Sequence, residues 1–368
     1  MTHAATTTTG VMIQNVSRWF AQHARVLPWR QRRTAYRVWL AEIMLQQTQV
    51  SVVVDYFERF VARYPDVASL AQASLDDVLA LWSGLGFYSR GRNLHRAAQQ
   101  VQQQCNGQFP QDRKGLMALP GVGSYTAGAI LAFAYNRAAA VVDGNVARVL
   151  SRLLADDACA KTPAGRRHFE AISLRWAQQT DQPAVLQEGL MELGALVCRS
   201  QNPACWACPL QRQCRAYAVG QVDRFPTVAA PIQRTDLQVA CALVHTPNCL
   251  WLERRNSAGL FGGLYEPPGC QLANKQQPRQ VVAQLLQQRG VCCNVAKLQA
   301  PVVVKRTLSH RNLVLHGVIV PLQQPVPGGQ HWIDAQQVQR IGLSRAVQLL
   351  LGKALPQHPC LSGTQVKA

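Results

Sequence analysis

Apolar residues recur at helical spacing over most of the first 200 positions of the chain. Turn residues such as Tyr64-Pro65-Asp66 separate the apolar segments. The pattern predicts helices over Asn15–Ala24, Tyr36–Gln47, Val50–Arg63, Leu75–Leu81, Arg90–Gln104, Ser124–Tyr135, Val146–Leu154, Arg166–Gln179 and Leu186–Val197. We therefore expect a mainly α-helical first domain over residues 12–220.

The pattern changes at residues 221–236, where Phe225-Pro226 and Ala230-Pro231 indicate a linker. Beyond the linker, segments rich in β-branched residues predict strands, with one helix among them. The strands span Leu237–His245, Cys249–Glu253, Val302–Arg306 and Leu313–Val320, and the helix spans Pro278–Arg289. We expect a smaller α+β domain over residues 237–355.

The charge of the chain indicates a polyanionic partner. Its 38 Lys and Arg against 19 Asp and Glu give a net charge of +19 and a pI near 9.9. A generic basic protein or an anionic membrane surface would also account for this charge. The sequence shows no amphipathic Lys/Arg helix, so nucleic acid is favoured. We expect a monomer that binds nucleic acid and no membrane.

The N-terminal segment and the cysteine content together indicate the cellular compartment. Met1–Gly10 is a Thr-rich polar tail without the apolar segment of a secretion signal, and no apolar run approaches the roughly 18 residues of a membrane span. Twelve cysteines without such a signal predict a reducing compartment. We expect a cytoplasmic protein, associated with the nucleoid if the source is bacterial.

Four of the cysteines form a compact motif, Cys-x6-Cys-x2-Cys-x5-Cys, over Cys198, Cys205, Cys208 and Cys214. Four thiolates complete the coordination shell of a tetrahedral zinc ion or of an iron–sulfur cluster. Scattered buried thiols are a less favoured interpretation at this density. The spacing alone leaves zinc and iron–sulfur open.

A glycine-containing turn joins two predicted helices at Leu119–Gly123. Gly121 and Gly123 permit a tight turn, and free backbone N–H groups at the start of the next helix suit a phosphate. An ordinary turn between helices is equally compatible with the two glycines. In the context Leu-Pro-Gly-Val-Gly, the segment resembles the helix-hairpin-helix motif that binds duplex DNA.

Two carboxyl groups are candidates for acid–base chemistry. Val38, Trp39 and Leu45 share one helical face with Glu42, and this apolar environment should raise the pKa of its carboxyl group. Asp143 precedes a predicted helix whose dipole should keep it ionised. Glu42 could instead lie at the edge of the apolar face, and Asp143 could be a plain helix cap, a role that Asn145 could equally fill. One carboxyl group with a raised pKa beside one with a lowered pKa is the arrangement used to cleave glycosidic bonds.

These segments together resemble the MutY family of adenine DNA glycosylases, within the helix-hairpin-helix glycosylase superfamily, from about residue 12 to 355. The stretches that carry the resemblance are Leu27–Arg30, Met44–Thr48, Trp82–Tyr88, Leu119–Gly128, Val142–Val146 and the four cysteines. The resemblance implies a [4Fe–4S] cluster rather than zinc. It also implies that the partner is double-stranded DNA, from which the enzyme removes adenine mispaired with 8-oxoguanine or guanine.

The resemblance implies roles for individual residues. Glu42 should protonate adenine at N7, and Asp143 should stabilise or trap the cationic sugar. Tyr125 and Asn145 should flank that intermediate, Arg30 and Glu188 should line the adenine pocket, and Gly121 and Gly123 should bind phosphate. The residues that should fill the gap left by the flipped base are Leu45, Gln47 and either Phe87 or Tyr88.

The family resemblance also implies that the enzyme does not cut the DNA backbone. Members of the superfamily that cut it carry a lysine where this chain has Tyr125, which cannot form a Schiff base. A purely hydrolytic glycosylase is therefore expected.

The second domain resembles the Nudix-like module with which such enzymes inspect the opposite base. The three glutamates of the pyrophosphatase motif are replaced by Gln284, Gln287 and Gln288, which are poor ligands for Mg²⁺. The family's Phe-Ser-His loop, which contacts 8-oxoguanine, is Leu308-Ser309-His310 here. The loop could also be a plain hairpin turn.

Two other functional classes deserve comparison with the glycosylase. A non-catalytic iron–sulfur DNA-binding protein would leave Glu42 unexplained within an apolar face. A nucleotide pyrophosphatase with a DNA-binding appendage is opposed by the three glutamines. The glycosylase is therefore favoured.

Overall fold

The computed structural model describes residues 2–227, 233–256, 259–273, 275–308, 310–326 and 331–361, with side chains from Thr8 onward. Packing divides the chain into two compact units. The helical unit comprises Met1–Ala71 and Arg96–Ala230, and the sheet unit comprises Gln72–His95 and Pro231–Ala368. Gln72–His95 belongs to the predicted first domain by sequence, so the limits of that domain stay a prediction. Within the described residues, no helix is long and apolar enough to cross a membrane.

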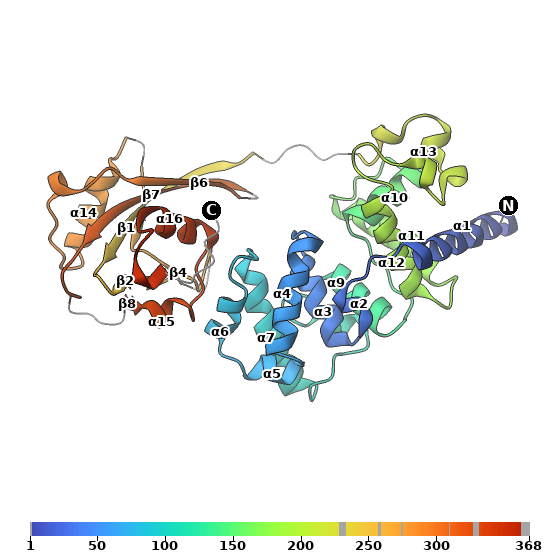
Figure 1. Cartoon of the computed structure of the whole chain (residues 1–368). Coiled ribbons are helices and arrows are strands. Elements are labelled where there is room, and N and C mark those ends of the chain that lie inside the picture. The colour runs from blue at the N-terminus through green and yellow to red at the C-terminus, as the bar shows by residue number, and fades with distance from the viewer. Residues whose placement is uncertain are drawn as a thin grey trace. The chain divides into compact units, whose positions relative to one another are not determined.

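Helices account for most of the first 220 residues (Figure 1). They are α1 (Thr2–His23), α2 (Pro28–Gln31), α3 (Ala35–Leu45), α4 (Val50–Arg63), α5 (Val67–Gln72), α6 (Leu75–Leu81), α7 (Tyr88–Gln104), α8 (Arg113–Met117), α9 (Ser124–Ala129), α10 (Gly144–Leu154), α11 (Pro163–Ala177), α12 (Pro183–Leu196) and α13 (Arg215–Ala218). A π-helical turn, η1 (Ile130–Ala134), continues α9. Every helix predicted from the hydrophobic pattern is present.

The N-terminal tail expected from the sequence is helical in the structure. Helix α1 begins at Thr2, whereas the Thr-rich segment up to Gly10 was predicted to be a tail. Met12, Ile13 and Val16 are buried. Once these residues fix the helix, each further residue adds a hydrogen bond at low cost, so the helix extends through the polar segment.

The hydrophobic core of the helical unit includes a cluster from α1, α10, α11 and α12. Phe20, Leu150 and Leu190 are buried in it. Gly194 lets α10 and α12 approach closely, because a Cβ atom at this position would lie 2.6 Å from the Cβ of Asn145. This close approach places Asn145 next to α12, within the candidate site described below.

A mixed sheet forms the centre of the sheet unit. In the described residues its strands are ordered β6-β7-β1-β2-β8, and β5 also pairs with β1. Their bounds are β1 (Thr235–His245), β2 (Cys249–Trp251), β5 (Gly269–Gln271), β6 (Val302–Thr307), β7 (Arg311–Pro321) and β8 (Trp332–Asp334). Strands β1 and β7 run parallel, and the other pairs are antiparallel. A separate two-stranded sheet pairs β3 (Glu253–Arg254) with β4 (Tyr265–Glu266).

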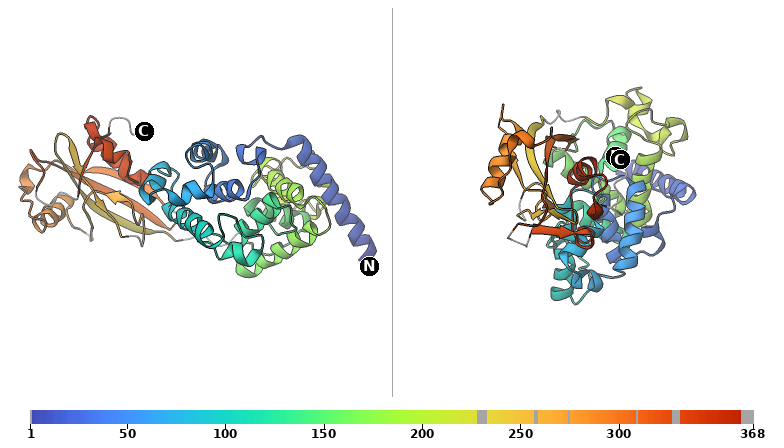
Figure 2. Two further views of the ribbon diagram at one scale, coloured as in Figure 1. Left: turned by 90° about the horizontal axis from the view of Figure 1, so that it is seen from below. Right: turned by 60° about the vertical axis from the view of Figure 1, so that its left-hand side comes forward.

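Helices cover both faces of the mixed sheet (Figure 2). Ala242 and Val244 of β1 pack with α14 (Pro278–Gln287), while Leu243 packs on the opposite face with α16 (Arg345–Ala354). This alternation follows from the two-residue period of a strand. The sequence pattern predicted α14 but not α16 or the short α15 (Ala335–Val338).

Candidate active site and cysteine centre

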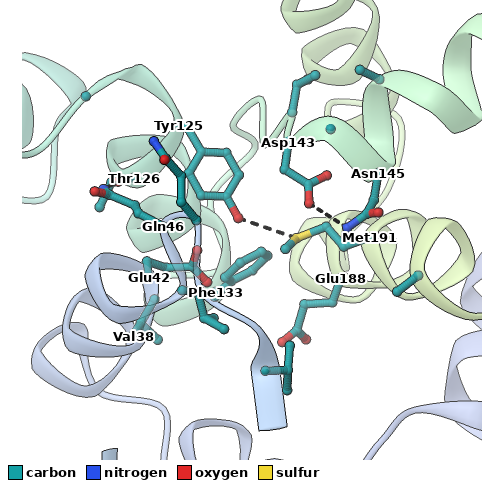
Figure 3. A pocket seen from close by; sticks show the side chains of 18 of the residues that line it. Val38, Glu42, Gln46, Tyr125, Thr126, Phe133, Asp143, Asn145, Glu188 and Met191 are labelled. Carbon is teal, nitrogen blue, oxygen red and sulfur yellow. Dashed lines mark hydrogen bonds between the residues drawn. The ribbon is translucent and has the colours of Figure 1, made fainter. Parts of the chain in front are cut away.

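A cavity of about 930 Å³ lies in the helical unit between α3, α9, α10 and α12. It brings together ten of the residues that the sequence singled out. They are Arg30, Glu42, Leu45, Gln47, Gly121, Gly123, Tyr125, Asp143, Asn145 and Glu188. Figure 3 shows the side chains of Glu42, Tyr125 and Asp143 directed toward the same space. Residues more than 140 positions apart in the chain thus share one site.

Glu42 lies on the buried face of α3 and is 4% exposed. Its Oε2 atom has no hydrogen-bond partner among the described residues. Burial raises the pKa of Glu42 to about 7, and the charges of Asp143 and Glu188 add to this shift. The Tyr125 hydroxyl group and Arg30 oppose it. The pKa of Glu42 therefore allows it to carry a proton near neutral pH, as the apolar face predicted.

Asp143 caps the N-terminus of α10. Its Oδ1 atom accepts a hydrogen bond from the Val146 N–H group at 2.8 Å, and its Oδ2 atom accepts one from Asn145 Nδ2 at 2.9 Å. The cap is therefore Asp143 and not Asn145. These bonds and Arg148 favour the anion, but burial is the larger effect, and the pKa of Asp143 is raised. The expectation that the helix dipole keeps this pKa low is wrong in direction.

Hydrogen bonds connect Asp143 with the cysteine segment. Asn145 Oδ1 accepts a bond from Arg148 Nη2 at 2.8 Å, while Arg148 Nε donates to the Cys198 carbonyl oxygen at 2.7 Å. Arg148 Nη2 also donates to the Gly194 carbonyl oxygen at 2.8 Å. The orientation of Asp143 therefore depends on where α12 ends and the cysteine segment begins.

A network of ion pairs lines another side of the cavity. Arg30 Nε lies 3.2 Å from Glu188 Oε1, and Arg30 Nη2 lies 3.1 Å from Glu192 Oε2. Arg33 also contacts Glu188, at 2.5 Å, and Arg25 contacts Glu192, at 2.6 Å. Both glutamates are buried, and two arginines stabilise each carboxylate. The network fixes the Arg30 and Glu188 side chains at the cavity wall.

The glycine turn has the geometry expected of a tight connection. Gly121 has a φ of +78°, which favours glycine, and both Gly121 and Gly123 are exposed beside the cavity. No side chain caps the N-terminus of α9 at Gly123. The exposed backbone at this turn is compatible with a phosphate contact.

The residues expected to fill the gap left by a flipped base differ in accessibility. Leu45 and Gln47 line the cavity, and Gln47 is exposed with a φ of +58°. Phe87, in the sheet unit, is 44% exposed. Tyr88 is 4% exposed, and its hydroxyl group donates a 2.5 Å hydrogen bond to the Leu343 carbonyl oxygen. Burial corrects the expectation for Tyr88 and leaves Phe87 as the candidate of the two.

The four cysteines of the motif meet around a small cavity of about 30 Å³. Burial raises the pKa of the Cys208 thiol to about 12, and the neighbouring cysteines raise it further. Among the described residues, no three Cys, His, Asp or Glu side chains lie close enough together to hold a single metal ion. A purely thiol donor set around a shared space fits a group that keeps all four sulfurs deprotonated.

The residues expected to read the opposite base lie between β6 and β7. Leu308 is half-buried, its N–H group donates to the Arg311 carbonyl oxygen at 2.7 Å, and its own carbonyl oxygen accepts a bond from Arg234. His310 is exposed. Ser309 lies outside the described residues. His310 is thus presented to solvent, as both interpretations of the sequence allow.

Two family models match the chain. The model of the HhH-GPD superfamily base excision DNA repair protein matches residues 40–173, and the NUDIX domain model matches residues 239–353. An adenine DNA glycosylase of Rattus norvegicus is 32% identical over 393 residues, covering 91% of this chain and 76% of that protein. An adenine DNA glycosylase of Buchnera aphidicola subsp. Acyrthosiphon pisum is 30% identical, covering 93% of this chain and 97% of that protein.

The chain belongs to the adenine DNA glycosylase family. The expected fold class, a helix-hairpin-helix domain followed by a Nudix-like domain, is confirmed.

Solved structures support the same helical fold. A thermostable thymine-DNA glycosylase aligns with a TM-score of 0.53 at 23% identity, covering 59% of this chain and 99% of that chain. Endonuclease III in a trapped covalent intermediate with DNA aligns with a TM-score of 0.50 at 22% identity, covering 58% of this chain and 98% of that chain. At these identities the likeness concerns the fold alone.

Arg25, Arg33 and Glu192 line the site of this family member, yet the sequence interpretation did not single them out. A signal was present for Glu192, because it follows Glu188 by four residues and therefore lies on the same face of α12. The arginines lie in loops on either side of α2, where periodicity gives no such signal.

Proposed function

We propose that this adenine DNA glycosylase acts in base excision repair on adenine mispaired with 8-oxoguanine or guanine in duplex DNA. It hydrolyses the N-glycosidic bond and leaves the DNA backbone intact. The observation that carries the proposal is the buried Glu42, with an unpartnered oxygen atom and a pKa near 7, in the same cavity as Asp143. Such a pair can supply both a proton and a negative charge.

Glu42 protonates the adenine base at N7, which makes the base a better leaving group. Departure of the base leaves positive charge on the sugar. Asp143 stabilises this charge or traps the sugar covalently until water attacks. The Val146 N–H group and the Asn145 amide hold the Asp143 carboxylate in place before charge develops, so little reorganisation is required at that moment.

The other cavity residues position the nucleotide. Arg30 and Glu188 offer donors and acceptors to the edge of adenine, and their shared network limits their movement. Tyr125 and Asn145 flank the sugar. Tyr125 cannot form a Schiff base, so the enzyme lacks the group that would cut the backbone. The volume of about 930 Å³ accommodates a flipped nucleotide.

Residues of both units contribute contacts with the duplex. The exposed backbone at Gly121 and Gly123 binds a phosphate, and the net charge of +19 strengthens binding along the duplex. Leu45 and Gln47, with Phe87, fill the space that the base leaves in the stack. In the second domain, Leu308, Ser309 and His310 contact 8-oxoguanine.

Cys198, Cys205, Cys208 and Cys214 would hold a [4Fe–4S] cluster, which would cross-link the cysteine segment through its four thiolate ligands. The purified protein should be brown and contain about four irons per chain. A colourless, zinc-loaded protein with full activity would contradict this assignment.

A single-turnover assay tests the reaction. Duplexes pairing adenine with 8-oxoguanine, guanine, cytosine or thymine are incubated with excess enzyme, and abasic sites are revealed by alkali. We expect release of adenine opposite 8-oxoguanine and guanine, with strand breaks only after alkali. Binding without release in every duplex would favour the non-catalytic alternative, and breaks before alkali would disprove the purely hydrolytic mechanism.

A further inference from the structure

Arg152 is a buried arginine in the last turn of α10. It is 2% exposed, and no carboxylate among the described residues lies within ion-pair distance of it. A buried guanidinium group without an anion is costly, because the group loses its hydration and gains no compensating charge. Backbone carbonyl oxygens that accept hydrogen bonds from the group offset part of this cost, and a negative charge nearby would offset more of it.

The contacts of Arg152 point to where that charge belongs. Its guanidinium Nη1 atom donates to Cys198 Sγ at 3.5 Å, and separately its main-chain carbonyl oxygen accepts a hydrogen bond from the Cys214 thiol at 3.4 Å. Arg152 also lines the small cavity around which the four cysteines meet. A cluster held by four thiolates carries a net negative charge that would face this guanidinium group.

The same guanidinium group also joins three parts of the chain. From α10 it donates to the carbonyl oxygens of Arg199 at 2.6 Å and Ser200 at 3.2 Å, in the cysteine segment. It donates as well to the carbonyl oxygens of Val222 at 3.1 Å and Phe225 at 2.9 Å, at the start of the predicted linker. Figure 1 shows α13, which follows the last cysteine, beside α10.

We infer that Arg152 is the buried counter-charge of the group that the four cysteines bind. It is also the clamp that fastens residues 222–225 to the cysteine segment. The inference rests on the proposed cluster. Arg152 is a positioning residue and does not touch the reacting atoms. A neutral side chain would remove both effects, whereas lysine would keep the charge but could not reproduce the planar set of donors.

The test uses the full-length, cluster-loaded protein. Arg152→Gln removes the charge, Arg152→Lys keeps it, and Arg175→Gln is the control, because Arg175 is exposed on α11 of the same unit. Three quantities are measured: the rate at which iron is lost to a chelator, the reduction potential of the cluster, and amide hydrogen exchange of residues 222–225.

Arg152→Gln should lose iron faster by about tenfold or more, the effect of losing a charge-assisted hydrogen bond. Its reduction potential should fall, because a nearby positive charge favours the more negative, reduced cluster. Arg152→Lys should retain the potential but show faster exchange at residues 222–225. The Arg175→Gln control should match the unaltered protein in all three measurements.

Unchanged iron loss, potential and exchange in Arg152→Gln would overturn the inference. If Arg152→Gln does not fold, the Arg152→Lys variant tests the inference. A lowered reduction potential in Arg152→Lys would disprove the counter-charge role. Unchanged amide hydrogen exchange of residues 222–225 would disprove the clamp. Iron and sulfide analysis of the unaltered protein tests the cluster separately. Zinc in place of iron would overturn the cluster but leave Arg152 testable through the rate of zinc release.

Discussion

Both units contain a helix on which carboxyl groups could carry chemistry, but only the helical unit retains them. Glu42 lies buried in α3, where its pKa is raised to about 7. In the sheet unit, Gln284 and Gln287 are exposed on α14, and Gln288 follows as its C-cap. An amide neither supplies a proton at neutral pH nor binds Mg²⁺ well. The comparison agrees with the proposal that the helical unit carries the catalytic groups and the sheet unit reads the opposite base.

The largest effect should follow from substituting Glu42 on α3. Glu42→Gln keeps the size of the side chain but removes the proton donor, so adenine release should fall by about 10²–10⁴-fold. Duplex binding should survive, because the basic surface is unchanged. Single-turnover kinetics and a binding titration measure the two properties. Glu58→Gln, an exposed position on α4, is the matched control. Substantial turnover by Glu42→Gln would remove Glu42 from its proposed role.

Asp143→Asn should reduce adenine release by roughly 10²–10³-fold, because a neutral amide stabilises a developing cation poorly. The amide can still accept the hydrogen bond from Val146, so the start of α10 should be preserved. Circular dichroism checks the fold, and single-turnover kinetics measure the rate. A rate within a few-fold of the unaltered enzyme would assign the stabilising charge to another group.

The sequence predicts the environment of Glu42 because that environment is local. Val38, Trp39 and Leu45 lie within one helical turn of it, so the helical period alone indicates an apolar face. The direction of the pKa shift of Asp143 was not predictable in this way. The sequence offered helix capping as an alternative role for Asp143, but its burial arises from packing between segments that are distant in the sequence and share one cavity.

The fold shows the same division between local and long-range information. Helix and strand positions follow from periodicity, and the predicted strands are present with ends shifted by a few residues. The parallel pairing of β1 with β7 joins segments more than 70 residues apart and has no local signature. The network of Arg25, Arg30 and Glu192 likewise depends on tertiary packing of α12 against loops near α2.

The raised pKa of Glu42 also predicts a pH effect on stability. Its pKa is about 7 in the folded protein and 4.5 at its ordinary value, so the folded state holds the extra proton between these pH values. The unfolded state binds fewer protons in this window, so the free energy of unfolding falls as pH rises from 4.5 to 7. The shift corresponds to about 3 kcal/mol.

Glu42→Gln should remove this pH dependence and be more stable than the unaltered protein at pH 8. Urea unfolding of both proteins at pH 5 and pH 8 gives the difference, and Glu58→Gln should show none. Adenine release should also decline as pH rises through 7, because the proton donor is lost. A stability difference that does not change between pH 5 and pH 8 would contradict the pKa near 7.

The smallest effect concerns recognition in the sheet unit. His310 is exposed directly before β7, where its imidazole ring can donate or accept a hydrogen bond at a base edge. Such a contact contributes roughly 1–3 kcal/mol of discrimination between bases. Ser309→Ala combined with His310→Ala should therefore reduce the preference for 8-oxoguanine over guanine by about tenfold or more.

If recognition and chemistry are separate, the double variant should change the rate of excision opposite 8-oxoguanine and not the rate opposite guanine. Excision opposite guanine should stay near its original rate, because Glu42 and Asp143 are untouched, while excision opposite 8-oxoguanine should slow. Single-turnover rates on the two duplexes give the ratio. Gln280→Ala, exposed on α14, is the control for a substitution elsewhere in the unit. If the double variant retained the full preference, reading of 8-oxoguanine would belong to the helical unit, and the division of tasks between the units would fail.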